Sequence, residues 1–269
     1  MGKLELTKDL WLKVPHEWGC DPLSAAIEES TGRARRSFSL HKVAVDRLNR
    51  LDIAIAMSVY RHPPTGDFEP ATVLAWRVHP TFRSTVQLAM EGRLFEAAQL
   101  TRSVIECAAY SLHVRANPAA ARAWSARRLD DEEGRFSVKS ISTSVDAHAP
   151  RARDLFKHVY EDSIAFGAHP NVGGVISGTE AYSTPTGLAA GAMSATDDAS
   201  EIAQCLGRAE MSGILAVRLL HRRNDPYTDP RATALIDDCD SAFEKDPIGT
   251  RRASTGTQIQ GKPGRPITR

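Results

Sequence analysis

Apolar side chains recur every three or four residues along most of the chain, which is the period of an α-helix that packs one face on a core. In residues 33–60 this series consists of Phe38, Val45, Leu48, Leu51, Ile55 and Val59. It predicts one long helix that ends at Tyr60, before a turn rich in proline. Comparable patterns predict further helices over residues 22–32, 70–78, 81–91, 93–115, 118–133, 137–147, 150–168, 198–223 and 230–245.

Residues that begin or stop helices set these predicted boundaries. Asp21-Pro22 forms an N-cap followed by proline at the first helical position, and Gly32 is expected to end that helix. Pro80 is expected to separate the two helices on either side of it, because proline lacks the amide hydrogen that a helix needs. Either Thr196 or Asp197 is expected to cap the long helix that follows them.

Residues 163–196 break the helical pattern. These 34 residues hold six of the 18 glycines and one charged side chain, Glu180. Glycine and proline oppose a helix, whereas the lack of charge is unusual for a solvated loop or a disordered segment. We therefore expect a long loop that covers an opening of the bundle, with a small hairpin around Val175 to Tyr182.

The apolar pattern as a whole predicts an all-α fold, a multi-helix bundle. Its parts are an N-terminal segment with a short helix (residues 1–32), a helical domain (33–246) that contains the glycine-rich insert (163–196), and a tail (247–269). The tail has few apolar residues and is punctuated by glycine and proline. Such a composition cannot form a packed core, so we expect a disordered tail.

Composition and charge are those of an ordinary globular protein. Apolar residues make up 42% and charged residues 25% of the chain, and the formal net charge is +1, which excludes collagen-like, coiled-coil and disulfide-scaffold classes. The four cysteines form no C-x-x-C pair, so we expect free thiols in a reducing compartment. Neither a secretory leader nor a run of about 20 apolar residues is present, so we expect a cytoplasmic protein with no membrane partner. The 26 arginines against 8 lysines are typical of a GC-rich bacterial genome.

The helix expected over 93–115 carries the first candidate site. Arg102 and Glu106 lie four residues apart and so share one side of the helix, where Tyr110 and His113 continue the row. The residues around them are apolar, so the row borders the core, where an ion needs a partner. The two charged residues form either a polar pocket, in which Arg102 binds an anion that Glu106 orients, or a structural ion pair.

A second candidate site lies where the helix over 150–168 runs into the glycine-rich segment. Tyr160 is followed there by His169-Pro170-Asn171. These polar groups either line a ligand site or cap the helix, with Asn171 bonding its last carbonyls. The ligand-binding residues that we expect to meet in one polar centre, contributed by two helices, are Arg102, Glu106, Tyr160, His169 and Asn171.

Arg153 and His158 form a third candidate site near the start of the same helix, with four residues between them. This spacing resembles the active motif of HEPN ribonucleases, which are small all-helical bundles. The resemblance implies metal-independent RNA cleavage, usually by a dimer, in defence or growth arrest. His158 would exchange the proton of the 2′-hydroxyl and Arg153 would stabilise the pentavalent phosphate, which makes them the candidate catalytic residues.

The tail is a candidate contact for nucleic acid. It holds five basic residues and no acidic ones, and its Gly264-Arg265-Pro266 core resembles an AT-hook, which inserts arginine into the minor groove. A salt-dependent attraction to RNA or DNA is one interpretation of this charge, and a solvated tail without function is the other. The tail residues that would contact nucleic acid are Arg251, Arg252, Lys262 and Arg265.

A wider resemblance covers about residues 80–172. The residues that carry it are Gly92, Glu96, Ala97, Leu100, Arg102, Glu106, Asn117, Pro118 and Trp124, followed later by Tyr160, Ser163, His169 and Asn171. They are similar to a family of uncharacterised bacterial helical proteins, in which a G-x-x-x-E-A-x-x-L-x-R-x-x-x-E helix precedes a helix with Tyr, Ser and His-Pro-Asn. The resemblance implies a fold rather than an activity.

Two classes of function agree with these patterns. The first is a binding or interaction module, whose polar pocket takes an unknown small ligand or protein partner under the glycine-rich segment. The second is a HEPN-like ribonuclease. The chain has no Walker, G-x-G-x-x-G, H-E-x-x-H or G-x-S-x-G motif, and we expect no cofactor and no metal ion. A homodimer is compatible with both classes.

Overall fold

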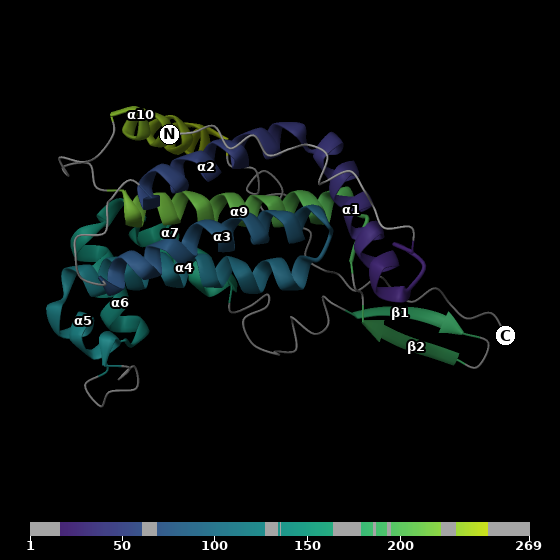
Figure 1. The fold of residues 1–269 in the computed structure, drawn as a ribbon, viewed down its shortest axis with the longest axis horizontal. Coiled ribbons are helices and arrows are strands. Elements are labelled where there is room, and N and C mark those ends of the chain that lie inside the picture. Colours follow the sequence, from purple (N-terminus) through teal and green to yellow (C-terminus); the bar gives the residue numbers. More distant parts are fainter. Residues whose placement is uncertain are drawn as a thin grey trace, which may run out of the picture.

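The computed structural model describes residues 17–60, 69–126, 134, 136–163, 179–184, 187–192, 195–221 and 230–246 (Figure 1). Its helices are α1 (Pro22–Leu40), α2 (Lys42–Tyr60), α3 (Pro70–Met90), α4 (Leu94–Ala116), α5 (Pro118–Ser125), α6 (Val138–His148), α7 (Arg153–Ser163), α9 (Ala199–Leu220) and α10 (Pro230–Lys245). A 3₁₀ turn, η2 (Pro150–Ala152), precedes α7, and strands β1 (Thr179–Thr184) and β2 (Gly187–Ala192) precede α9. The predicted all-α bundle is confirmed.

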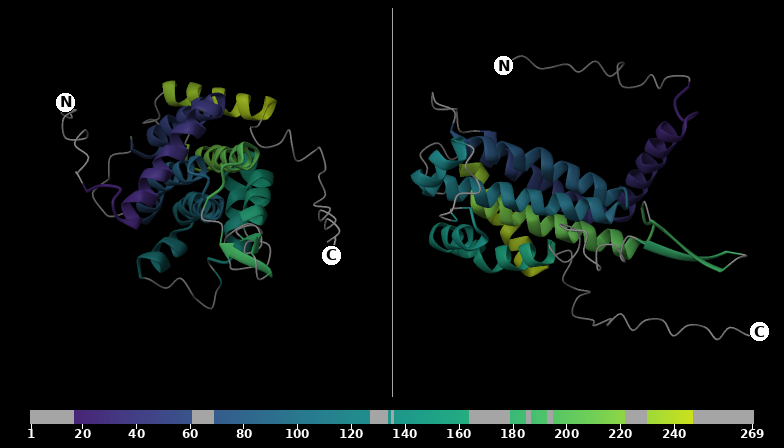
Figure 2. Two further views of the ribbon diagram at one scale, coloured as in Figure 1. Left: turned by 90° about the vertical axis from the view of Figure 1, so that its right-hand side faces the viewer. Right: turned by 90° about the horizontal axis from the view of Figure 1, so that it is seen from below.

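The core lies between α2, α3, α4 and α9, which run side by side (Figures 1 and 2). Helix α9 is the central one, because it packs on the other three and 15 of its 22 residues are buried. Gly213 permits the close packing: a β-carbon there would lie 2.7 Å from Phe82 Cε2 and 3.2 Å from Leu51 Cδ1. The core is therefore built around a helix from late in the chain.

The turn between α3 and α4 is tied to the residues just before α9. Gly92 has a φ of +74°, a conformation that glycine adopts without steric cost. Its carbonyl accepts a hydrogen bond from the Thr196 amide at 2.9 Å. A β-carbon on Gly92 would lie only 2.0 Å from the Thr196 carbonyl oxygen. This close approach fixes where α9 starts relative to α3 and α4.

Helices α6 and α7 form a second layer on α4. Their buried apolar residues are Ile141 and Val145 on α6 and Phe156 and Val159 on α7. The helix expected over 150–168 starts as the 3₁₀ turn η2 and continues as α7 to Ser163, while its expected last residues lie outside the described ranges. Residues of α4 and α7 are thereby brought together.

The long helix expected over 33–60 is wrong, and so is the expected end of the preceding helix at Gly32. Helix α1 continues through Gly32 to Leu40, and the break falls at His41, whose φ of −115° and ψ of 34° leave the helical region. A glycine inside a helix costs about 1 kcal/mol relative to alanine, which does not stop a helix whose next residues favour it. As a result α1 turns away from α2 and projects from the bundle (Figure 2).

The break expected at Pro80 is also wrong, because α3 is continuous from Pro70 to Met90. Pro80 is exposed, so the carbonyl that loses its helical partner can bond to water. In the same turn the Thr81 hydroxyl donates to the Arg77 carbonyl at 2.7 Å. A proline on the solvent side of a long helix is therefore tolerated here.

Helix caps were predicted correctly at α1 and incorrectly at α9. The Asp21 carboxylate accepts hydrogen bonds from the amides of the second and third residues of α1, as expected of an N-cap. At α9 the cap is Asp198, whose carboxylate accepts from Ser200 and Glu201, rather than Thr196 or Asp197. The Thr196 hydroxyl instead accepts a hydrogen bond from the Asp198 amide at 3.1 Å, which holds the N-cap residue in position.

The predicted hairpin is present but lies further along the chain than expected. Strands β1 and β2 pair antiparallel with Thr184 opposite Gly187, and the hairpin extends away from the bundle (Figure 1). Only part of the expected span, Val175 to Tyr182, belongs to it, and residues 171–178 lie outside the described ranges. The basic tail, residues 247–269, also lies outside them. No helix in the described part of the chain has the length and apolar character needed to cross a membrane.

Candidate functional site

Three of the residues expected in the polar centre lie together. Arg102 and Glu106 are one turn apart on α4, and Arg102 Nε donates to Glu106 Oε1 at 2.7 Å. The Arg102 guanidinium carbon lies 5.5 Å from the centre of the Tyr160 ring on α7, the geometry of a cation–π contact. Both charged side chains are partly buried. Two separate helices therefore contribute to one polar cluster.

A small cavity adjoins this cluster between α4, α6 and α7. Its lining residues are Glu106, Ala109, Tyr110, Val138, Ile141, Phe156 and Tyr160. The cavity measures about 20 Å³, which is room for one water molecule. Aromatic rings border it, since Tyr110 stacks on Phe136 with centroids 5.8 Å apart and Phe156 lies 5.7 Å from Tyr160. The lining thus combines one carboxylate with apolar and aromatic surface.

Charges in the centre favour the ionised pair and the neutral phenol. Burial alone would lower the pKa of Arg102, but the hydrogen bond and charge of Glu106 outweigh it and raise that pKa. Burial, and then the nearby Glu106 charge, raise the pKa of the Tyr110 phenol. At neutral pH Tyr110 is therefore a hydrogen-bonding hydroxyl beside an Arg102–Glu106 ion pair.

His169 and Asn171, the other two residues expected in the polar centre, lie outside the described ranges. Their place relative to Arg102 stays a prediction. The tail residues Arg251, Arg252, Lys262 and Arg265 lie outside the described ranges as well.

Arg153 and His158 are both exposed on α7. They are five residues apart within one helix, which places them about 140° apart around its axis. Arg153 Nε donates to the neighbouring Asp154 at 3.0 Å. Within one chain, the structure therefore does not bring the two candidate catalytic residues to the same side of α7.

One acidic side chain near the end of α7, that of Asp162, is engaged by arginine. Asp162 accepts from Arg208 Nε on α9 at 3.0 Å, an ion pair that joins the two helices. Among the residues that the structure describes, no three His, Cys, Asp or Glu side chains are placed to hold a metal ion.

A second polar cluster, centred on Asp52 of α2, was not predicted from the sequence. Its carboxylate accepts two hydrogen bonds from Arg83 at 2.8 Å and one from His79 Nε2 at 2.9 Å. The other ring nitrogen of His79 lies 3.2 Å from the Tyr60 hydroxyl. Burial raises the pKa of Asp52, but Arg83 and His79 outweigh it, so the pKa is lowered. The cluster fastens α2 to α3.

The sequence indicates only the part of this cluster that lies on α3. His79 and Arg83 have helical i, i+4 spacing, which places them on one side of α3. Asp52 is 27 residues earlier, on another helix, and only the packing of α2 on α3 brings it near.

A buried ion pair occupies the middle of the bundle. Glu210 on α9 is 2% exposed and bonds to Arg47 on α2. The Arg47 guanidinium also donates to the carbonyls of Ala242 and Asp246 at the end of α10. A charge at this depth is retained only with a partner, so the pair fixes α2, α9 and α10 relative to one another.

Comparison with known proteins assigns no relative to this chain: no family model, no curated protein and no solved structure matches it. The similarity to an uncharacterised bacterial family and to HEPN ribonucleases therefore stays a prediction. The function therefore has to be inferred from the residues themselves.

Proposed function

We propose that the protein is a binding module that holds a small organic cation in the cavity between α4, α6 and α7. The observation that carries the proposal is the lining, in which Glu106 is the charged residue beside the rings of Tyr110, Phe156 and Tyr160. A carboxylate next to aromatic rings is the chemistry that proteins use to recognise ammonium and guanidinium groups.

Arg102 supports this choice of ligand class. Its guanidinium makes the two contacts that such a ligand needs, a hydrogen bond to Glu106 and a cation–π contact with Tyr160. The expectation that Arg102 binds an anion stays untested; in this proposal Arg102 is instead a positioning residue, held by Glu106 and the Tyr160 ring. The ion pair then sets the Glu106 carboxylate in place beside the cavity.

The size of the cavity means that a ligand larger than water has to open it. Helix α6 forms the side most suited to move, because Val138 at its N-terminal end is exposed, whereas α7 is held to α9 by the Asp162–Arg208 ion pair. An outward shift of its first turn enlarges the cavity without disturbing the packing of α9 on α4. Ligand entry and movement of α6 are therefore coupled in this proposal.

Three probes of similar shape and different charge test the proposal: benzamidinium, benzoate and benzyl alcohol. We expect benzamidinium to bind about tenfold more tightly than benzoate, measured by titration calorimetry on the full chain. Glu106→Gln should abolish this preference. Glu96→Gln, on the same helix but in a partly exposed pair with Arg93 that lies outside the cavity lining, should leave it unchanged. Equal affinity for the three probes, no binding of any, or a preference that survives Glu106→Gln would each reject the proposal.

The ribonuclease alternative has no specific observation in its favour, since Arg153 and His158 lie on different sides of α7. Its test is the induction of the wild type and of His158→Ala in bacteria. RNA decay or growth arrest with the wild type alone would establish the alternative, and equally harmless behaviour of both would reject it.

A cytoplasmic location is part of the proposal. It is supported by the four free cysteines, of which Cys205 and Cys239 are buried. Fractionation of cells that express the chain tests it, and recovery with the membranes or the medium would contradict it.

A further inference from the structure

Exposed large apolar side chains gather on α1 and its immediate flanks. Of the ten such residues in the described part of the chain, six fall between residues 18 and 43: Trp18, Leu23, Ile27, Phe38, Leu40 and Val43. Helix α1 is also the helix that leaves the bundle (Figure 2). Single apolar residues on a surface need no explanation, but a concentration on one projecting element marks an interaction surface.

Five residues form one continuous line along α1, which we call the α1 stripe: Leu23, Ile27, Ser30, Ala34 and Phe38. At 100° per residue their directions fall within about 80° of one another. The stripe points about 100° away from Arg33, whose Nε anchors α1 to the bundle through the Glu91 carbonyl at 3.1 Å. The α1 stripe therefore lies to one side of the face that packs on the bundle: Leu23, Ile27 and Phe38 are exposed, while Ser30 and Ala34 are partly covered by the rest of the chain.

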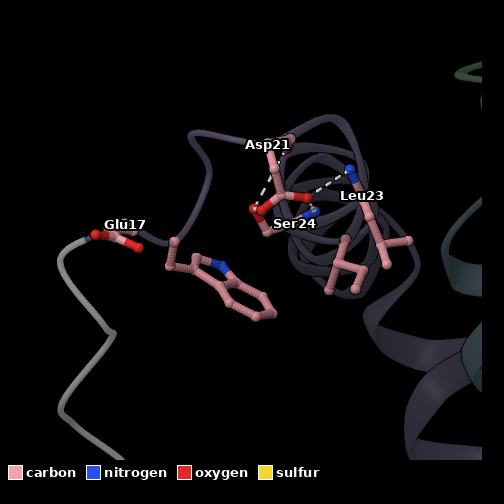
Figure 3. Close-up of a pocket in the computed structure, with 6 residues that line it drawn as sticks. Glu17, Asp21, Leu23 and Ser24 are labelled. Carbon is pink, nitrogen blue, oxygen red and sulfur yellow. Dashed lines mark hydrogen bonds between the residues drawn. The ribbon is translucent and has the colours of Figure 1, made fainter.

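A groove of about 300 Å³ lies at the N-terminal end of the α1 stripe (Figure 3). Trp18, Leu23 and Ile27 supply its apolar walls. The Asp21 carboxylate bonds to the first amides of the helix, and Trp18 Nε1 donates to Glu28 at 3.3 Å, so the turn that forms the groove is fixed. Its volume is sufficient for an aromatic ring.

We propose that α1 pairs antiparallel with α1 of a second copy of this chain, so that the Phe38 ring of each copy enters the groove of the other. When Leu23 lies opposite the second copy's Phe38, Ile27 lies opposite Ala34 and Ser30 lies opposite Thr31. Ser30 and Ala34, the small residues in the middle, let the two helices approach closely. The arrangement has a two-fold axis, as most homodimers do.

Charge complementarity selects the antiparallel direction. Glu28 and Arg35 lie on the same flank of the α1 stripe, seven residues apart. In an antiparallel pair the same flanks of the two helices face each other, so Glu28 of each copy lies near Arg35 of the other. In a parallel pair the two copies of this flank would lie on opposite sides of the interface, so Glu28 and Arg35 would not meet. The Arg35 side chain makes no ion pair with any other described residue of its own chain.

The exposed apolar area of the α1 stripe is that of a small dimer interface. Leu23 is 71% exposed, Phe38 45% and Ile27 44%, so with Trp18 the stripe offers on the order of 400 Å² of apolar side chain per copy. A standard interface buries about 800 Å² per partner. Polar atoms along a helix of 19 residues, about 28 Å long, have to supply the remainder. We therefore expect a reversible dimer rather than a permanent one.

The first experiment measures the mass of the full chain by sedimentation over about 1 to 100 µM. We expect a concentration-dependent dimer, weakened at least tenfold by Ile27→Glu. Ile53→Glu is the matched control, because Ile53 is 45% exposed on α2 and lies off the stripe. Circular dichroism should show that both variants remain folded. A wild type that is monomeric throughout, or equal effects of the two variants, would overturn the proposal.

Charge reversal tests the Glu28–Arg35 contact between copies. Arg35→Glu alone and Glu28→Arg alone should each weaken the dimer, because each places like charges opposite one another twice. Mixing the two variants should restore it, because every contact then joins opposite charges. Variants that dimerise as tightly alone as in the mixture would contradict the contact.

Disulfide formation tests the direction of pairing, in a chain that also carries Cys20→Ser to remove the exposed native thiol. Ser30→Cys lies near the two-fold axis and should cross-link to itself. Ile27→Cys should not, because seven residues of helix rise, about 10 Å, separate the two copies of that position along the axis. Equal cross-linking at both positions would indicate a parallel pair and reject the proposal.

Removal of residues 1–16 distinguishes a second copy from the chain's own N-terminal segment as the occupant of the α1 stripe. We expect the shortened chain to dimerise as the full chain does. A full chain that is monomeric and a shortened chain that dimerises would show that residues 1–16 cover the stripe, and would overturn the proposal.

Discussion

Gly92→Ala tests the contact that ties the α3–α4 turn to the start of α9. Two costs add at this position. Alanine at a φ of +74° costs about 1–2 kcal/mol in backbone strain. Its β-carbon would also lie 2.0 Å from the Thr196 carbonyl oxygen, so the two segments have to separate. Separation breaks the hydrogen bond from the Thr196 amide, worth about 1 kcal/mol, and disturbs the packing next to it.

We expect Gly92→Ala to lower the free energy of unfolding by about 3–5 kcal/mol, a large share of the 5–15 kcal/mol of a typical domain. For a chain of this size this corresponds to a fall of roughly 10 °C in the melting temperature. Urea denaturation followed by circular dichroism measures the first quantity and calorimetry the second.

Gly19→Ala is the matched control, because Gly19 also has a positive φ, +88°, but nothing within 4 Å of the added β-carbon. It carries the backbone strain without the steric overlap, so it should cost no more than about 2 kcal/mol. Equal urea midpoints for the two variants would refute the reasoning, because the contact with Thr196 would then contribute nothing.

Three further predictions concern buried or partly buried ionisable groups. The lowered pKa of Asp52 means that its carboxylate stabilises the fold above the ordinary value of 3.8, and that this contribution is lost as the pH falls below it. Asp52→Asn should therefore be less stable at pH 7 and lose less stability than the wild type between about pH 4 and pH 2, measured by thermal denaturation. Burial raises the pKa of Cys205 to about 11, so in the native protein a thiol reagent at pH 8 should modify the exposed Cys20 and spare Cys205, as mass spectrometry would show. Glu210→Ala leaves Arg47 buried without its carboxylate and should lower the free energy of unfolding by about 3–5 kcal/mol in urea; a loss below about 1 kcal/mol would mean that water compensates the charge.

The sequence predicts most helices correctly because their boundaries are local. Asn117 caps α5 with its own side chain, as Asp21 caps α1, and the apolar period of α9 is nearly continuous. The failures at Gly32 and Pro80 have one cause. A residue that disfavours a helix by about 1–3 kcal/mol stops it only when its neighbours gain nothing by continuing, and that gain comes from tertiary packing.

The candidate site was predictable only to the extent that it is local. The pairing of Arg102 with Glu106 follows from their four-residue spacing. The contact between Arg102 and Tyr160 depends on how α7 packs on α4, and the spacing of residues within one helix does not determine that. The α1 stripe was hidden for a related reason, since the predicted break at Gly32 divided it between two helices.

The central position of α9 has a consequence for how the chain folds during its synthesis. Helices α2, α3 and α4 leave the ribosome before the helix that their inner faces surround, with α9 following α4 by more than 80 residues. During that interval the apolar faces of the early helices remain exposed, because the contacts that bury them are distant in sequence. Chains that stop short of α9 should therefore depend on chaperones or aggregate, whereas loss of residues 247–269 should leave these helix contacts intact.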